Sequence, residues 1–166
     1  MVNIELEYAA KKKIAQCLAQ AKTTFKRTFP SPTLNFNVRG KVAGKAYLQR
    51  NEIRLNPVLF VENQQDFINE VIPHEVAHLL TFQLYGRVKP HGKEWQYVMS
   101  HAFNVAPSTT HQFSTQSVQG KTFAYQCLCS EHALTVRRHN KVIRRQMQYS
   151  CTKCKQVLTF TGIQLT

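Results

Sequence analysis

The chain contains no hydrophobic run that approaches the length of a membrane span. The stretch from Met1 to Lys13 is charged and has no apolar core, so it does not have the pattern of a signal peptide. We therefore expect a cytoplasmic protein with no membrane partner. Its 166 residues are enough for one domain with a sizeable core and a small appendage.

Acidic residues are scarce. The sequence has 9 Asp and Glu against 22 Lys and Arg, which gives a formal net charge of +13. The excess is concentrated toward the end, because Glu131 is the one acidic residue from Lys121 onward. Such a basic segment predicts a polyanionic partner, most simply a nucleic acid such as DNA. The alternative is a generally basic surface without a specific partner.

Two histidines stand four residues apart in His74-Glu75-Val76-Ala77-His78. On a helix, residues four apart lie on one face, so both imidazoles can reach one zinc ion. The glutamate between them can lie beside a zinc-bound water and accept its proton. The pattern predicts a catalytic zinc centre with Glu75 as the base. The alternative is a buried helix that happens to carry two histidines.

Helical periodicity predicts one helix over residues 4–29, a scaffold with Cys17 as a small core residue. A second helix is expected from an N-cap at Asn63 to Tyr85, bent at Pro73 and ended by Gly86. A third is expected to open at His91.

Between the first two helices, three short runs of residues predict a small antiparallel sheet beside the zinc helix: 34–38, 43–48 and 51–56. An edge strand in that position can bind an extended peptide by backbone pairing. The run 51–56 is the candidate for the edge, and an interior position is the alternative.

A catalytic zinc usually has three protein ligands and an open position for water. The metzincin pattern would place its Gly and its third His at positions that are Thr81 and Leu84 here, so that pattern is absent. The remaining candidates are His91, which a helix-turn-helix can bring back over the first pair, and Glu94, one turn further on.

Several separated motifs resemble the SprT family of zinc metallopeptidase-like proteins. They are Ile53-Arg-Leu-Asn-Pro57, Pro73-His-Glu-Val-Ala-His-Leu-Leu80, Gly86-Arg-Val-Lys-Pro-His-Gly-Lys-Glu-Trp95, Thr110-His-Gln-Phe113 and Arg137-Arg-His-Asn140. The resemblance covers roughly residues 20 to 160, with the motifs in the right order. Through this family the chain also resembles the Spartan group, which are proteases that degrade proteins crosslinked to DNA.

The resemblance implies that His91 is the third zinc ligand and that Glu94 is an outer residue. It also implies metal-assisted hydrolysis of a protein or peptide, in which Glu75 takes a proton from water and returns it to the leaving amine. No oxyanion donor is evident in the sequence. Tyr47, His101 and His111 are possible donors, but each residue type is more often a hydrogen-bonded structural residue.

Four of the five cysteines cluster near the end, as Cys127, Cys129, Cys151 and Cys154. In a reducing compartment such a cluster favours a metal over disulfides. Structural zinc accepts four cysteines, or three cysteines and a histidine. Two ligand sets are therefore open: the four cysteines, or Cys129, His132, Cys151 and Cys154 with Cys127 left free.

Between the two cysteine pairs, the alternation of Leu134 and Val136, followed by a polar run, predicts a β-hairpin that returns over residues 142–149. Five basic residues crowd this hairpin: Arg137, Arg138, Lys141, Arg144 and Arg145. Guanidinium groups pair with phosphates, and Tyr149 offers a face for an unpaired base. The hairpin is therefore the predicted DNA contact. A solvated charged face is the alternative.

Taken together, the sequence predicts an α+β protein. Residues 1–120 form a zincin-like peptidase domain with the active-site helix beside a small antiparallel sheet, and residues 121–166 form a zinc-ribbon β module. One Zn²⁺ is expected to be catalytic and one structural. The predicted function is hydrolysis of proteins on or near DNA. The alternative is a nucleic-acid-binding regulatory protein without significant protease activity.

Overall fold

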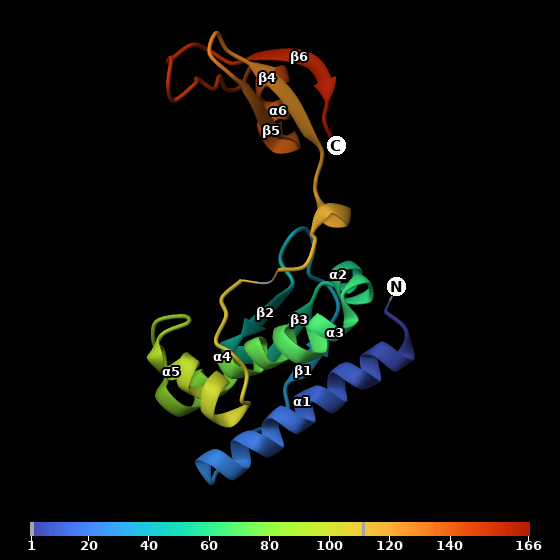
Figure 1. Ribbon diagram of the computed structural model, residues 1–166, viewed down its shortest axis with the longest axis vertical. Coiled ribbons are helices and arrows are strands. Elements are labelled where there is room, and N and C mark those ends of the chain that lie inside the picture. The colour runs from blue at the N-terminus through green and yellow to red at the C-terminus, as the bar shows by residue number, and fades with distance from the viewer. Residues whose placement is uncertain (1, 111) are drawn as a thin grey trace. The chain divides into compact units, whose positions relative to one another are not determined.

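The computed structural model describes residues 2–110 and 112–166 (Figure 1). The chain divides into two compact units, Met1–Val118 and Gln119–Thr166. Each unit combines helical structure with a three-stranded sheet, in the second unit through the single described helix α6 (Val136–Ile143), so the predicted α+β class is confirmed. Within the described residues, none of the helices is both long enough and apolar enough to cross a membrane.

Helix α1 spans Ile4–Phe25 and begins at Asn3, whose side chain accepts a hydrogen bond from the Leu6 N–H at 2.9 Å. Its buried face includes Ile14 and Cys17, as predicted. Burial raises the pKa of the Cys17 thiol to about 12, as expected for an inert core residue. The helix ends earlier than predicted because Lys26 has a left-handed backbone, with φ of 52°.

The sheet of the first unit has the strand order β1-β3-β2. The strands are β1 (Thr33–Asn35), β2 (Gly44–Tyr47) and β3 (Glu52–Leu55). Strands β2 and β3 are antiparallel and are joined by the short 3₁₀ helix η1 (Leu48–Arg50), whereas β1 runs parallel to β3.

The predicted antiparallel arrangement is therefore wrong, because the sheet is mixed. Of the two positions left open for the third run, the structure has the interior one: β3 is the central strand and not the edge. Ile53 and Leu55 of β3 are fully buried and the strand has a neighbour on each side. Alternation in a sequence shows which residues face the core, but it does not encode the order or the direction of the strands. The edges of the sheet are β1 and β2.

The region predicted as one helix from Asn63 to Tyr85 is a series of helical pieces that starts earlier. The pieces are α2 (Pro57–Glu62), α3 (Gln64–Asp66), the π-helical turn η2 (Phe67–Val71) and α4 (Ile72–Tyr85). The side-chain cap is made by Asn56, whose oxygen accepts from the N–H groups of Val58 and Leu59 at 3.1 and 3.3 Å. Asn63 makes no such cap bond.

Pro73 lies in the first turn of α4, directly after the π-helical turn η2. The turn before it is wide, since the Ile72 N–H donates to the Phe67 carbonyl, five residues back. The π-helical turn thus accommodates the proline that the sequence predicted would interrupt the helix.

Helix α4 occupies the middle of the first unit, where it contacts α1 and strand β2 (Figure 1). Most of its residues up to Thr81 are buried. It ends at Gly86, whose N–H donates to the Phe82 carbonyl. The elements that follow are α5 (Lys93–Tyr97), the π-helical turn η3 (Val98–Ala102) and the 3₁₀ helix η4 (Gln116–Val118).

The second unit is a small antiparallel sheet with the order β5-β4-β6. Its strands are β4 (Thr122–Gln126), β5 (Glu131–Thr135) and β6 (Thr159–Gln164). The turn between β4 and β5 is closed by the Cys127 N–H, which donates to the Ser130 carbonyl at 3.1 Å. A second turn is closed by the Cys151 N–H, which donates to the Gln156 carbonyl at 2.8 Å.

The predicted basic hairpin is wrong, because its residues form helix α6 (Val136–Ile143). Arginine and lysine are good helix formers, and the run has no glycine to make a tight turn. Tertiary packing fixes the helix: the His139 ring stacks on Phe123 at 3.7 Å between centroids, and its Nδ1 lies 3.0 Å from the Tyr125 hydroxyl. Strand β5 pairs with β4 instead.

Candidate metal centres

Three imidazoles meet in the first unit. His74 and His78 lie one turn apart on α4, and His91 comes from the loop before α5, where its backbone has a φ of 57°. The three Nε2 atoms are separated by 3.1 Å for His74–His78, 3.1 Å for His78–His91 and 3.0 Å for His74–His91. The sequence left the third position open between His91 and Glu94, and the structure brings His91 into the group.

Hydrogen bonds alone do not explain this arrangement. A neutral imidazole Nε2 is either a donor or an acceptor. Among three such atoms at least two are alike, so at least one contact joins two lone pairs or two N–H groups and is repulsive. If the three Nε2 lone pairs bind one cation, each of the three distances is the spacing between two ligands of that cation, and no repulsive contact remains.

The group fits zinc in distance and in chemistry. Tetrahedral zinc with Zn–N bonds of about 2.0–2.1 Å separates its nitrogen ligands by about 3.3–3.4 Å. The observed spacings are only a few tenths of an ångström shorter. Burial, and secondarily the charge of His91, lowers the pKa of His78 to about 4, which keeps its imidazole in the neutral, metal-binding form at pH 7.

Glu75 lies beneath strand β2 and is 6% exposed. Burial raises the pKa of its carboxyl to about 8, and a hydrogen bond from the Ala46 backbone N–H partly opposes this shift. A cation on the neighbouring histidines acts in the same direction as Ala46, because opposite charge favours the carboxylate. A carboxyl with a pKa held near neutrality suits a group that accepts and returns a proton.

Gly44 makes the position of Glu75 possible. A Cβ atom on Gly44 would lie 2.8 Å from the Glu75 Oε1 and 2.9 Å from its Cγ. Only glycine lets the strand approach the carboxylate this closely. This role was not predicted from the sequence, although an isolated glycine in a strand is a signal of close approach.

Trp95 is fully buried, and its neighbours are the three grouped histidines. Its ring centroid is 4.8 Å from His74, 5.5 Å from His78 and 4.8 Å from His91. Its indole N–H donates to the His74 carbonyl at 3.3 Å. The tryptophan therefore holds the imidazoles in place, a role that periodicity alone could not distinguish from ordinary core packing.

Two of the three possible oxyanion donors make ring contacts with side chains other than the grouped histidines. Tyr47 has the Arg54 guanidinium over its ring at 4.2 Å, and His101 stacks on Tyr97 at 4.1 Å. These contacts agree with the structural roles that the sequence favoured for both. His111 lies outside the described residues.

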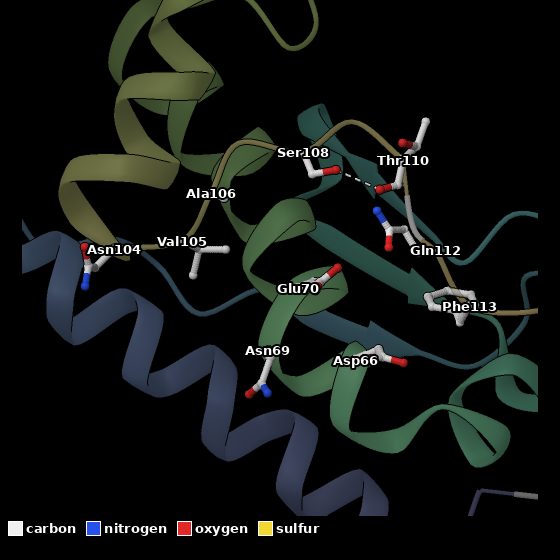
Figure 2. Close-up of a pocket in the computed structure, with 10 residues that line it drawn as sticks. All are labelled: Asp66, Asn69, Glu70, Asn104, Val105, Ala106, Ser108, Thr110, Gln112 and Phe113. Carbon is white, nitrogen blue, oxygen red and sulfur yellow. Dashed lines mark hydrogen bonds between the residues drawn. The ribbon is translucent and has the colours of Figure 1, made fainter.

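A separate cavity of 620 Å³ lies in the first unit between the segment with the π-helical turn η2 and residues 104–110, 112 and 113 (Figure 2). Its lining mixes polar and apolar groups and includes Asp66, Glu70 and Phe113, and the Ser108 hydroxyl in it donates to the Thr110 carbonyl at 2.7 Å. None of the three grouped histidines lines it. The ligand chemistry, and not the size of a cavity, therefore marks the candidate site.

The four clustered cysteines converge in the second unit, with all their sulfur atoms within 4.8 Å of one another. The Sγ atoms of Cys127 and Cys129 are 3.5 Å apart, and those of Cys129 and Cys151 are 3.6 Å apart. Tetrahedral zinc with Zn–S bonds of about 2.3 Å separates its sulfurs by about 3.8 Å. The cysteines fit a zinc ion.

The surroundings favour the thiolate at Cys127 and Cys151. At Cys129 the Ser130 hydroxyl lowers the pKa, but contacts with the other three cysteines outweigh it and raise the pKa to about 11. Backbone N–H groups of Cys154 and Lys153 lower the pKa of Cys151 to about 7. Burial raises the pKa of Cys127, but hydrogen bonds from the Cys129 N–H and from His132 outweigh it and bring the value to about 5. His132, the alternative ligand, has its Nε2 3.3 Å from the Cys127 sulfur.

The predicted DNA-contact residues lie on or directly after α6. Arg137, Arg138, Arg144 and Arg145 are exposed and Lys141 is half-buried. The Arg138 guanidinium lies over the Tyr149 ring at 5.5 Å from the centroid, so this arginine already occupies one face of the ring that the sequence offered to a base.

These observations define a class of protein: a metal-binding helix with a buried glutamate in one unit, and a cysteine ribbon in the other. The chain belongs to the SprT-like family, whose model matches residues 14–115, and the model of the SprT-like zinc ribbon domain matches residues 121–162.

Relatives named "Protein SprT" match nearly the whole chain. The Vibrio parahaemolyticus protein is 59% identical over 99% of this chain and 100% of its own length. The Shewanella oneidensis protein is 51% identical over 89% of this chain and 94% of its own, and the Yersinia enterocolitica protein is 49% identical over 98% of each. No solved structure matches the chain.

Proposed function

We propose that this protein is a zinc metallopeptidase of the SprT family that acts on proteins on or near DNA in the cytoplasm. One zinc ion is held by His74, His78 and His91, and a second is held by the four clustered cysteines. The observation that carries the proposal is the convergence of three imidazole nitrogens, 3.0–3.1 Å apart, beside a buried glutamate.

The residues around the histidines divide the work of hydrolysis. When bound, zinc supplies a Lewis acid that polarises a carbonyl and makes water more acidic. Glu75 accepts a proton from the attacking water and returns it to the leaving amine, a role for which its pKa near neutrality is suited. Gly44 and Ala46 hold this carboxylate in place from strand β2.

Strand β2 is also the surface on which we place the substrate. It is an edge of the sheet and contacts α4, the helix that carries Glu75. An extended peptide can pair with such an edge through its backbone, which brings a carbonyl close to the catalytic residues. This assigns to β2 the substrate role that the sequence had assigned to β3.

The test is the substitution Glu75→Gln, which keeps the shape of the side chain and removes its basicity. We expect hydrolysis of an unfolded reporter protein to fall by about 10²–10⁴-fold, the usual contribution of a general base, while the zinc content stays unchanged. Glu94→Gln is the matched control and should retain activity, because Glu94 lies outside the group of converging ligands. Hydrolysis by the Glu75→Gln protein at the wild-type rate would remove Glu75 as the base.

A second candidate function is a nucleic-acid-binding regulator without significant protease activity. The basic side chains of α6 favour it, since the second unit carries eight basic residues and one acidic residue. We expect DNA affinity to fall steeply with salt. Reversing the charges of Arg144 and Arg145 should weaken binding and leave the zinc content unchanged. Salt-dependent binding together with inactive wild-type protein would favour the regulator, and binding insensitive to salt would exclude the phosphate contacts.

A further inference from the structure

The cysteine cluster has one donor more than a zinc ion takes. Besides the four sulfurs, the Nε2 of His132 lies 3.3 Å from the Cys127 Sγ and 3.1 Å from the Ser130 hydroxyl. In a tetrahedral site with one nitrogen ligand, sulfur and nitrogen are separated by about 3.6 Å. His132 is therefore at ligand distance from Cys127, although structural zinc binds only four donors.

Strand pairing fixes His132 in this place. In the antiparallel register of β4 and β5, His132 is opposite Tyr125 and Leu134 is opposite Phe123. Paired residues share a face of the sheet, and the residues two further along each strand share it too. Cys127, two residues after Tyr125, thus follows the same inner face as His132, and the proximity does not depend on a mobile loop.

Of the two neighbours, Cys127 holds the coordination position. Its sulfur belongs to the group of four that lie within 4.8 Å of one another, and the His132 nitrogen does not. While the thiolate is a ligand, the His132 Nε2–H can donate to its sulfur, a usual contact for a coordinating thiolate. The Ser130 hydroxyl lies beside both groups, at 3.7 Å from the Cys127 sulfur.

Loss of Cys127 would leave a complete set of donors. Cys129, His132, Cys151 and Cys154 have gaps of two residues on both sides, which is the more usual spacing for structural zinc. To become a ligand, His132 exchanges its Nε2 proton for one on Nδ1, with solvent as the acceptor and the source. Its ring then moves toward the vacated position, less than the width of one side chain away.

We propose that His132 is a reserve ligand of the ribbon zinc, which takes the coordination position of Cys127 when that thiolate is removed or modified. The inference rests on the proposal that the four cysteines hold zinc. It gives the ribbon a way to keep its metal, and with it its fold, after the loss of one half-exposed thiolate.

The experiment uses the full-length protein loaded with Co²⁺ in place of zinc. Sulfur-to-cobalt charge-transfer absorption comes only from thiolate ligands, so it reports the ribbon and ignores the histidine centre. Cys127→Ala should keep about three quarters of the wild-type absorption, because three of four thiolates remain. Cys154→Ala is the matched control and should lose the ordered site, since His132 contacts Cys127, Ser130 and Cys151 and has no such contact with Cys154 among the described residues. Cys127→Ala/His132→Asn should lose it as well, while His132→Asn alone should keep the full absorption.

Two results would overturn the proposal. If Cys127→Ala and the milder Cys127→Ser both lose the absorption as completely as Cys154→Ala, His132 does not replace the thiolate. If Cys127→Ala leaves the spectrum unchanged and His132→Asn alters it, His132 is the resident ligand and Cys127 lies outside. An absence of sulfur-to-cobalt absorption in the wild type would instead refute the ribbon zinc itself, which separates the two failures.

Discussion

The two candidate metal centres differ in what surrounds them. The histidine centre offers three protein ligands, a buried carboxylate beside them and an edge strand alongside. The cysteine centre offers four sulfurs, with a fifth donor in reserve, and the one acidic residue of its unit is the exposed Glu131. An open position and a base suit chemistry, whereas a closed set of thiolates suits structure.

The hydrophobic cores of the two units also differ, in the number of residues that they bury. Among the described residues, the core cluster of the first unit contains 22 buried hydrophobic residues, and that of the second contains four, Tyr125, Leu134, Cys151 and Leu158. A unit of this second kind is too small to be stabilised by its apolar core alone and needs a metal or another crosslink. A metal can therefore bind to a fold that is stable without it, or it can be required for the fold to form.

The largest expected effect tests this contrast directly. In the Cys154→Ala protein we expect the ribbon to unfold, because structural zinc contributes on the order of 10–16 kcal/mol to such domains. In the His91→Ala protein we expect the histidine centre to lose its zinc while the first unit stays folded. Zinc stoichiometry and amide hydrogen exchange measure both effects. Protected amides in β4 of the Cys154→Ala protein would show that the ribbon does not depend on its metal.

A smaller effect is expected from Gly44→Ala, which affects only the histidine centre. The new Cβ would meet the Glu75 carboxylate at 2.8 Å, so the side chain or the strand must move. Displacements of about 1 Å in a catalytic site cost up to about 10²-fold in rate, and we expect hydrolysis to fall by about 10–100-fold with the zinc content unchanged. Gly120→Ala is the matched control, because no atom lies within 4 Å of its Cβ. Equal activity of the two variants would show that the close approach is dispensable.

The pH dependence of the metal-free first unit gives a third test. The pKa of Glu75 is raised to about 8 in the folded state, so above its unfolded value the native state binds more protons and stability falls as pH rises. His78 acts in the opposite sense, but only between its folded pKa of about 4 and its unfolded value near 6.5. Glu75 therefore dominates from pH 6.5 to 8, where we expect a loss of about 2 kcal/mol.

Urea unfolding after removal of zinc by a chelator measures this slope, with Glu75→Gln as the control. The variant has no ionising group at this position. Its unfolding free energy should therefore lack the loss of about 2 kcal/mol that we expect for the wild type over the same pH range. Parallel curves for the two proteins would mean that the buried carboxyl does not titrate near neutrality.

The sequence predicted those parts of the site that depend on spacing along one element. His74, Glu75 and His78 share a helix, so their convergence follows from the helical repeat. Spacing alone narrowed the third ligand to His91 or Glu94 but could not choose between them. The approach of His91 to the other two histidines depends on a loop that has a left-handed backbone at that residue. Gly44 and Ala46 reach Glu75 through a strand some thirty residues away, and strand position is not written in local periodicity.

The same limit explains the errors in the fold. Strand β3 has the alternation of an edge strand but lies in the centre, because β1 pairs with it from the other side. Residues 136–143 have the polarity of a turn but form α6, because His139 stacks on Phe123 and contacts Tyr125. In both cases a contact between distant segments decided between two locally acceptable structures.

The smallest expected effect concerns Trp95, which joins the core of the first unit to its centre. In the Trp95→Phe protein the packing against the imidazoles is largely retained, but the hydrogen bond to the His74 carbonyl is lost. We expect a loss of about 1 kcal/mol in unfolding free energy, the net contribution of one hydrogen bond, and a modest loss of zinc affinity. Circular dichroism during urea unfolding measures the first, and competition with a chelator measures the second. Unchanged zinc affinity in a destabilised protein would mean that Trp95 serves the core alone, and that the imidazoles are held in place by the backbone of α4 and the loop before α5.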